Sequence, residues 1–186
     1  MITLEIPKPW ITQCRKFAEA SVDSSQSTWR VNREKAITDI FTGKMGEVGA
    51  FIHLCELGQL PTPPDFTVYT ARNKSFDADL FMGNYRVHCK TQSAESMEKY
   101  GVSWILQYGA KRCDPLFKRR DQDDLFMGMS LNGQEVTIHL RTRVNDLFEW
   151  EAVGLPTLKW LEQTKRAVYF DAIEKAPKSV RWVPIK

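Results

Sequence analysis

Hydrophobic residues in the first third of the chain recur every three to four positions. Ile11 and Phe17 follow this spacing within 9–24, where a proline at the start suits the first turn of a helix. The same spacing runs through 33–57, and Gly58 with the prolines after it ends the pattern. The pattern therefore predicts a helix over 9–24 and one long helix, or two abutting ones, over 33–57.

Three glycines interrupt the second predicted helix at regular intervals. Gly43, Gly46 and Gly49 lie three residues apart, and each costs up to ~1 kcal/mol relative to alanine in a helix interior. Glycine at such positions permits close approach of another backbone or of a ligand. We expect a sheet or a ligand against this face, or a break in the helix near Gly43.

The middle of the chain alternates between polar and apolar residues, as strands do. Gly83-Asn84 and Asn132-Gly133 are typical of tight hairpin turns. The predicted strands are 65–70, 79–82, 85–91, 102–108, 125–131 and 135–143. Segment 156–174 has helical spacing, although its AVYF part could instead form a strand. This order predicts one α+β or mixed α/β domain over 1–186, with a central mixed sheet flanked by helices.

Composition excludes several protein classes. Hydrophobic residues make up 42% and charged residues 26% of the chain, as in an ordinary globular protein. There is no apolar run of the roughly 20 residues that span a bilayer, and no secretory signal, so we expect a cytoplasmic protein without membrane contact. The four cysteines form no CxxC pair, which favours reduced thiols over a zinc site or disulfides. A net charge of +3 excludes a histone-like polycation but allows a locally basic surface.

Chemistry-bearing side chains gather on the first predicted hairpin. With a turn at Gly83-Asn84, Asp79 lies opposite His88, and His88, Lys90 and Gln92 share one face of the second strand. Asp77 would face Lys90 if the pairing extends that far, and the other face is mostly apolar. A half-exposed antiparallel pair of strands explains the same alternation, so the pattern alone does not assign a function.

The segment DLFMGNYRVHCKTQ resembles the core of the PD-(D/E)XK nuclease superfamily. In that superfamily an aspartate begins a hairpin, and a glutamate-x-lysine follows on its second strand. Asp79, Lys90 and Gln92 match this pattern, whereas His88 stands where an acid is usual. Glu47 corresponds to the glutamate that such proteins carry on the preceding helix. The resemblance covers about 33–110 and implies a restriction-endonuclease-like core.

The resemblance implies a metal-dependent endonuclease that hydrolyses DNA. Asp79 and Glu47 would bind Mg²⁺ or Mn²⁺, with His88 and the backbone carbonyl of Cys89 as further ligands. Lys90 would orient or deprotonate the attacking water or stabilise negative charge, and Gln92 would position water, phosphate or Lys90. The expected partner is duplex or branched DNA. Because cutting both strands commonly uses a two-fold dimer, we also expect a homodimer.

Basic residues outside the hairpin are candidates for contact with the DNA backbone. The segment 111–120 holds five basic residues and one acid. The candidates are Lys111, Arg112, Lys118, Arg119, Arg120, Arg141 and Arg143. Gln107 is a further candidate site residue, and we place Trp104 in the core. Lys165 and Arg166, on the predicted last helix, could contact the DNA backbone or simply be solvated.

Other interpretations of the same residues stay open. Glu47 could be a solvated carboxylate paired with Lys44 one helical turn away, and Lys90 a solvated strand lysine. The histidine at the acid position would also suit a nucleic-acid-binding protein on a degenerate nuclease scaffold. A Holliday-junction-resolvase-like enzyme is a close variant of the leading hypothesis. A zinc enzyme using His53, His88 and His139 is a third, weaker class.

Overall fold

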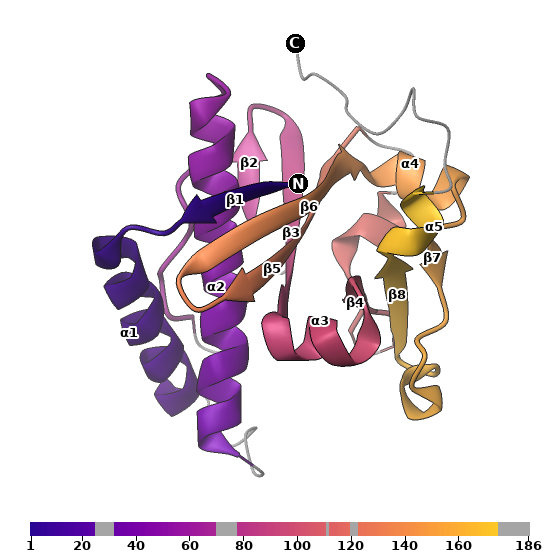
Figure 1. Ribbon diagram of the computed structural model, residues 1–186, viewed down its shortest axis with the longest axis horizontal. Coiled ribbons are helices and arrows are strands. Elements are labelled where there is room, and N and C mark those ends of the chain that lie inside the picture. Colours follow the sequence, from indigo (N-terminus) through magenta and orange to yellow (C-terminus); the bar gives the residue numbers. More distant parts are fainter. Residues whose placement is uncertain (25–31, 70–77, 111, 120–122, 175–186) are drawn as a thin grey trace.

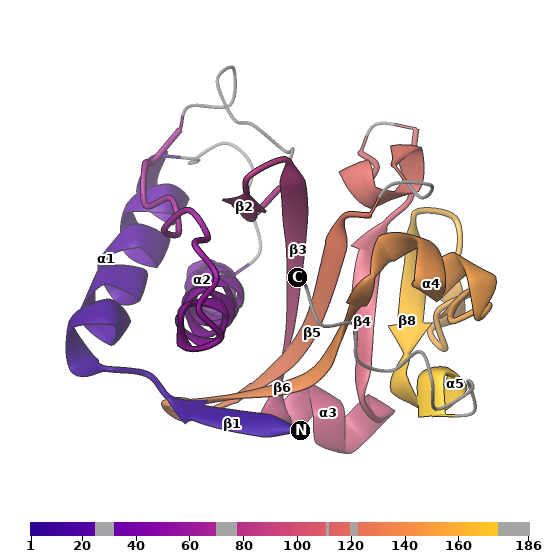
Figure 2. The same cartoon turned by 90° about the horizontal axis from the view of Figure 1, so that it is seen from above.

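The chain forms three layers in the computed structural model, which describes residues 1–24, 32–69, 78–110, 112–119 and 123–174 (Figure 1). A five-stranded sheet lies in the middle, with the helices α1 and α2 on one face. A three-stranded sheet and the short helices α4 and α5 lie on the other face, as Figure 2 shows from above. The expected mixed α/β architecture is therefore present.

The two long helices are α1, Lys8–Ser24, and α2, Arg33–Glu56. Asn32 caps α2, because its side chain accepts a hydrogen bond of 3.0 Å from the amide of Lys35. Gly58 follows the end of α2 with a positive φ of 73°, which favours glycine. Both predicted helices are confirmed, and the second is one continuous helix without a break at Gly43.

The glycines of α2 let the helix lie close to the central sheet. A Cβ on Gly46 would lie 2.9 Å from the Cβ of Thr91, and one on Gly49 would lie 2.7 Å from a methyl group of Val136. A Cβ on Gly43 would meet nothing within 4 Å. The expected approach of a sheet is therefore confirmed for the two later glycines, whereas Gly43 faces open space.

The central sheet has the strand order β1-β6-β5-β3-β2. Its strands are β1 Ile2–Glu5, β2 Leu80–Met82, β3 Tyr85–Ser93, β5 Leu125–Asn132 and β6 Glu135–Arg143. Strands β3 and β5 are parallel, and the other neighbours are antiparallel. Both predicted hairpins are confirmed, and Met82 pairs with Tyr85 as the Gly83-Asn84 turn requires.

The second sheet has the order β4-β8-β7. Its strands are β4 Ser103–Gln107, β7 Val153–Gly154 and β8 Lys165–Tyr169. A single helix over 156–174 is wrong, whereas the alternative of a strand in its AVYF part is confirmed: the segment contains a 3₁₀ turn at Lys159–Leu161, the strand β8 and the short helix α5, Phe170–Glu174. The reason is tertiary, because Lys165–Tyr169 pairs antiparallel with β4, about sixty residues earlier in the chain. Lys165 and Arg166 therefore belong to a strand.

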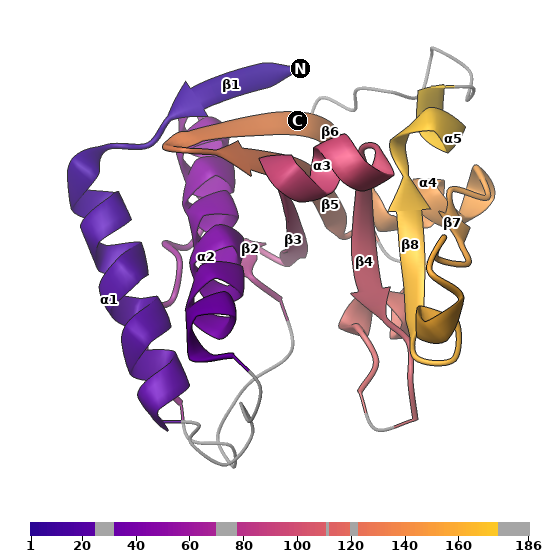
Figure 3. The same ribbon diagram turned by 60° about the horizontal axis from the view of Figure 1, so that its bottom comes forward.

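Several further elements differ from the prediction. Residues 65–69 form no strand, and residue 70 lies outside the described part. Strand β1 and two short helices, α3 Ala94–Tyr100 and α4 Val144–Glu149, follow no pattern strong enough to predict them. Helix α3 lies in the parallel connection from β3 to β5, which needs a crossover rather than a tight turn (Figure 3).

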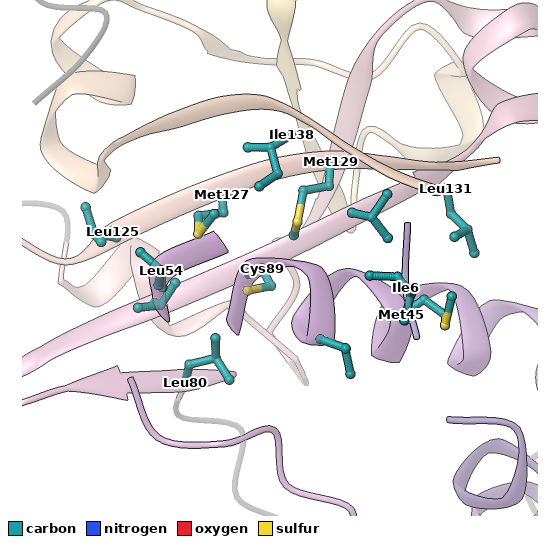
Figure 4. Packing of buried hydrophobic residues seen from close by; sticks show 14 of the residues in the cluster. Ile6, Met45, Leu54, Leu80, Cys89, Leu125, Met127, Met129, Leu131 and Ile138 are labelled. Atoms are coloured by element: carbon teal, nitrogen blue, oxygen red, sulfur yellow. The ribbon is translucent and has the colours of Figure 1, made fainter. Parts of the chain in front are cut away.

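Two hydrophobic cores cover the two faces of the central sheet. The first lies between α2 and the sheet, where side chains such as Met45, Leu54, Cys89 and Met129 meet (Figure 4). The second lies between the sheets around Trp104, which is 2% exposed, as predicted for a core residue. Its ring occupies the space that a side chain at position 128 would need, and its Nε1 donates to the carbonyl of Met129 at 2.8 Å.

All four cysteines are free, in agreement with the predicted reduced thiols. Throughout the described residues, none of the helices combines the length and the apolar character that crossing a bilayer demands.

Candidate active site

One cavity of about 910 Å³ brings together residues that are far apart in the chain. Most of its wall comes from α2, from the segment 62–69, from the β2–β3 hairpin and from residues 105–107 and 112–115. Gln107 and five of the predicted site residues line the cavity. The five are Glu47, Asp79, His88, Lys90 and Arg112.

Asp79 is tied to the neighbouring strand by both its backbone and its side chain. Its amide donates to the carbonyl of Val87 at 3.1 Å, which continues the hairpin register and places Asp79 beside His88, as predicted. Its Oδ2 accepts a hydrogen bond of 2.7 Å from the amide of Cys89. The N–H and C=O of one strand residue point to the same edge, so the Cys89 carbonyl also points toward the edge where Asp79 lies.

Glu47 reaches the cavity from α2 and is paired with Lys44. The Lys44 Nζ lies 2.5 Å from Glu47 Oε2, and only 14% of the Glu47 side chain is exposed. Burial raises the pKa of Glu47 to about 8; the negative charge of Asp79 adds to the rise, and Lys44 opposes it. The pair with Lys44 was one of the open interpretations, and it is present, but it is buried rather than solvated.

Lys44 connects α2 to the opposite wall of the cavity. Its Nζ also donates to the backbone carbonyl of Asp65 at 2.9 Å, and it lies 4.6 Å from the centre of the Phe17 ring. Asp65 in turn accepts a hydrogen bond of 2.6 Å from the hydroxyl of Tyr69. This network holds the segment 62–69 in place beside Glu47.

Lys90 points to the other side of the cavity, where it meets an acid that the pattern did not single out. Its Nζ lies 2.8 Å from Asp114 Oδ1, and Asp114 Oδ2 accepts a hydrogen bond of 2.5 Å from the amide of Gln107. Lys165 on β8 donates to the side-chain oxygen of Gln107. Burial lowers the pKa of Lys165, and the positive charges of Arg112 and Lys90 lower it further, while Asp114 raises it. In the described part of the chain, this wall therefore holds Lys90, Arg112 and Lys165 around the carboxylate of Asp114.

His88 is buried between two acidic side chains. It is 3% exposed, and its Nε2 lies 3.7 Å from Asp124 Oδ2 with no hydrogen-bond partner. Burial lowers the pKa of His88, although the charges of Asp79 and Asp124 oppose this, so the imidazole is neutral at neutral pH. The Nε atom of Arg119 lies 2.6 Å from Asp124 Oδ2 and forms an ion pair with it. The Nε2 atom of His88 therefore faces Asp124 without a hydrogen bond.

Gln92 lies away from the cavity and joins two elements. Its Nε2 donates to the carbonyl of Gly101 at 3.0 Å, and its Oε1 accepts from the amide of Ser103 at 3.0 Å. These bonds connect β3 to the start of β4. The side chain that the resemblance linked to water or phosphate therefore has both amide atoms engaged within the fold.

The structure separates the basic candidates. Arg112 lines the cavity and Lys118 is exposed, whereas Arg119 pairs with the buried Asp124. Arg141 is only 8% exposed, so it does not extend a basic surface as expected. Arg143 lies 3.2 Å from Asp123. The candidates Lys111 and Arg120, together with Asp77, lie outside the described residues.

The histidines do not form a common site. Within the described ranges, no three side chains of histidine, cysteine, aspartate or glutamate are gathered so that they could hold a metal ion. His53 lies on α2, His88 on β3, and His139 on β6 beside Ser130 at 2.8 Å. The zinc hypothesis loses its geometric basis. A cation in the cavity would instead have two carboxylates, a backbone carbonyl and water as oxygen ligands.

Sequence reasoning did not assign three charged residues of this cavity to the site: Lys44, Asp65 and Asp114. The spacing of Lys44 and Glu47 was a visible signal, and Asp114 is the one acid within the basic segment 111–120. Neither signal indicates which distant side chain the residue meets. Comparisons with protein-family profiles, with curated proteins and with solved structures return no match to this chain.

Proposed function

We propose that this protein is a metal-dependent endonuclease that hydrolyses DNA on a restriction-endonuclease-like core. The observation that carries the proposal is the meeting of Glu47 and Asp79 in one cavity with Lys90. The charge of Asp79 contributes to raising the pKa of Glu47 to about 8, after the larger effect of burial. A divalent cation bound beside Glu47 would offset the negative charges there and favour its ionised form.

The oxygen atoms around this point suit a hard cation. Asp79 and Glu47 supply carboxylates, and the Cys89 carbonyl points to the edge where Asp79 is anchored by a bond of 2.7 Å. Mg²⁺ usually keeps several waters and binds through one or two carboxylates, so a third acidic side chain is not required. His88 lines the same cavity, and an imidazole ligand would favour Mn²⁺ if its ring turned toward the cation. A bound cation would polarise the phosphate and supply a hydroxide nucleophile.

Lys90 is the residue of this chain that acts on the reacting groups. Its ammonium reaches the cavity from β3, two residues after His88, and Asp114 holds it at 2.8 Å. In this position it can hold the attacking water or stabilise the charge that develops on the phosphate. Gln92, engaged with Gly101 and Ser103, contributes through the position of β3 instead.

The test is a cleavage assay with purified protein on linear, circular and four-way-junction DNA, with Mg²⁺ or Mn²⁺. We expect cleavage by the wild type and a loss of at least about 100-fold in Lys90→Ala and Asp79→Asn. Lys35→Ala is the matched control, because Lys35 is an exposed lysine of α2 paired only with Asp39 among the ion pairs described. Circular dichroism and thermal melting verify that each variant is folded. Wild-type cleavage by Lys90→Ala would contradict the proposal.

A second candidate function is DNA binding without cleavage, which the burial of His88 at the position of the usual acid favours. The same assay separates the two, since a binding protein would show salt-dependent affinity and no cleavage with either metal. Faster cleavage of four-way junctions than of linear duplex would indicate a resolvase-like enzyme.

A further inference from the structure

We propose that the cavity binds an unpaired stretch of a DNA strand, with a base stacked against Phe81 and Tyr69. This inference rests on the proposed function, because it names the form of the substrate that the same site takes. It depends on the aromatic side chains of the cavity, on the charges of its two walls and on the depth of the carboxylates.

Large apolar side chains from separate segments line this charged cavity while remaining exposed. Phe81 on β2 is 37% exposed, Tyr69 is 41% exposed and Ile105 on β4 is 44% exposed. The neighbours of Phe81 in the strand, Leu80 and Met82, point into the core and are at most 6% exposed. Single exposed apolar residues need no explanation, but their convergence on one cavity indicates a ligand with an apolar face.

The two aromatic residues are held in place without a ligand. Thr62 fixes the backbone of Phe81, because its Oγ1 accepts from the Phe81 amide at 2.9 Å and its amide donates to the Phe81 carbonyl at 2.7 Å. The hydroxyl of Tyr69 donates to Asp65 at 2.6 Å, and Lys44 secures Asp65 in turn. Anchored aromatic rings bind a base with little loss of conformational entropy.

The walls of the cavity carry charges of both signs. Glu47 and Asp79 lie with Lys44 on the wall formed by α2 and the start of the hairpin, whereas Lys90 and Arg112 lie with Asp114 on the second wall. Lys165 extends the second wall through its bond to Gln107. A phosphate held by the cations and a base stacked on the aromatics are together the chemistry of one nucleotide.

The depth of the site favours a strand without its complement. The Glu47 side chain is 14% exposed and lies within walls from four parts of the chain. In a duplex the bases are stacked inside the helix, so a base cannot reach an aromatic side chain while its phosphate enters the cavity. In a single strand or a flap, base and phosphate can enter together.

The experiment measures binding without cleavage. Labelled oligonucleotides are titrated with protein in EDTA at one salt concentration, and the affinity is read by fluorescence anisotropy. The ligands are a single strand, the duplex of the same sequence and a duplex with an unpaired flap. We expect the single strand and the flap to bind more tightly than the duplex, and Phe81→Ala to weaken their binding about tenfold. Phe81→Trp should restore it, because stacking needs a ring rather than a particular residue.

Tyr85→Ala is the matched control. Tyr85 is an aromatic residue of the same hairpin, 45% exposed, and it does not line the cavity. We expect its removal to leave the affinity for single strands unchanged. Equal or tighter binding of the duplex would overturn the inference, as would an equal effect of Phe81→Ala and Tyr85→Ala. A protein that discriminates as expected in EDTA but cleaves no DNA with Mg²⁺ or Mn²⁺ would overturn the proposed cleavage and keep this binding mode.

Discussion

Asp114 holds Lys90 across the cavity, with 2.8 Å between Asp114 Oδ1 and Lys90 Nζ. The other oxygen of Asp114 accepts the amide of Gln107, so the carboxylate joins the end of β4 to the middle of β3. These two strands belong to different sheets. The position of Lys90 therefore depends on an acid that comes 24 residues later in the chain.

Replacing Asp114 with asparagine tests whether this contact positions Lys90. An asparagine has one acceptor oxygen, so either Lys90 or the Gln107 amide would face an NH₂ group. We expect cleavage to fall roughly 10- to 100-fold while metal affinity stays unchanged, because the lysine loses its orientation. Asp123→Asn is the control, since Asp123 is 57% exposed and pairs with Arg143. Wild-type turnover by folded Asp114→Asn would show that the contact is not needed.

Replacing glycine with alanine should have opposite effects on stability at two positions of α2. Gly46→Ala forces a methyl group against Thr91, and we expect a loss of about 1–3 kcal/mol in the free energy of unfolding. Gly43→Ala meets nothing within 4 Å and should be neutral or stabilising by up to ~1 kcal/mol, since alanine favours the helix. Urea unfolding of both variants measures the difference. Equal stability of the two would contradict the packing described between α2 and β3.

Lys44 and Glu47 form a buried pair. A double-mutant cycle can measure how much their interaction contributes to the free energy of unfolding. Lys44→Met leaves the Glu47 carboxyl without its cation, with side chains that are only 9% and 14% exposed in the wild type. At a pH well above 8, where this carboxyl is ionised, we expect this single change to cost roughly 3 kcal/mol of stability. Adding Glu47→Gln should restore part of the loss, because no unpaired charge then remains. Additive effects in thermal or urea unfolding would show that the pair is not coupled.

Buried histidines make stability depend on pH. Burial lowers the pKa of His53, and the positive charge of Arg141 lowers it further. The unfolded chain therefore binds a proton at this histidine more readily than the folded protein does. The contribution of His53 to stability is therefore present above about pH 6.5 and is lost as the pH falls through the lower folded pKa. Glu47 has the opposite sign: its contribution is full at low pH and is lost as the pH rises through about 8.

The variant His53→Gln isolates the histidine contribution. We expect its free energy of unfolding to fall less than that of the wild type between pH 7.5 and 5.5, values chosen as roughly one unit on either side of the ordinary histidine pKa. Urea unfolding at the two pH values measures this difference. Parallel curves for the two proteins would mean that His53 titrates alike in the folded and unfolded states.

Patterns within short segments predicted the elements that depend on interactions between residues close together in the sequence. The stripe of α2 and the turns at Gly83-Asn84 and Asn132-Gly133 depend on nearby residues, and the structure has the expected helix and hairpins. The segment 156–174 was predicted as a helix because its apolar spacing suits one. Pairing with β4 outweighs that preference and makes Lys165–Tyr169 a strand.

For the candidate site too, some residues could be named from the sequence, whereas their partners could not. Glu47, Asp79 and Lys90 were named from the sequence because the hairpin and the helix before it resemble a nuclease pattern, whereas the alternation of the strands alone did not assign them a role. The partners of these residues depend on the packing of the layers. Asp114 reaches Lys90 only because the second sheet packs against the first, and Asp65 meets Lys44 only because the segment 62–69 crosses α2. The sequence by itself determined which groups can do chemistry, and the tertiary structure decided which are buried, paired and neutral, because burial and pairing are set by residues distant in the chain.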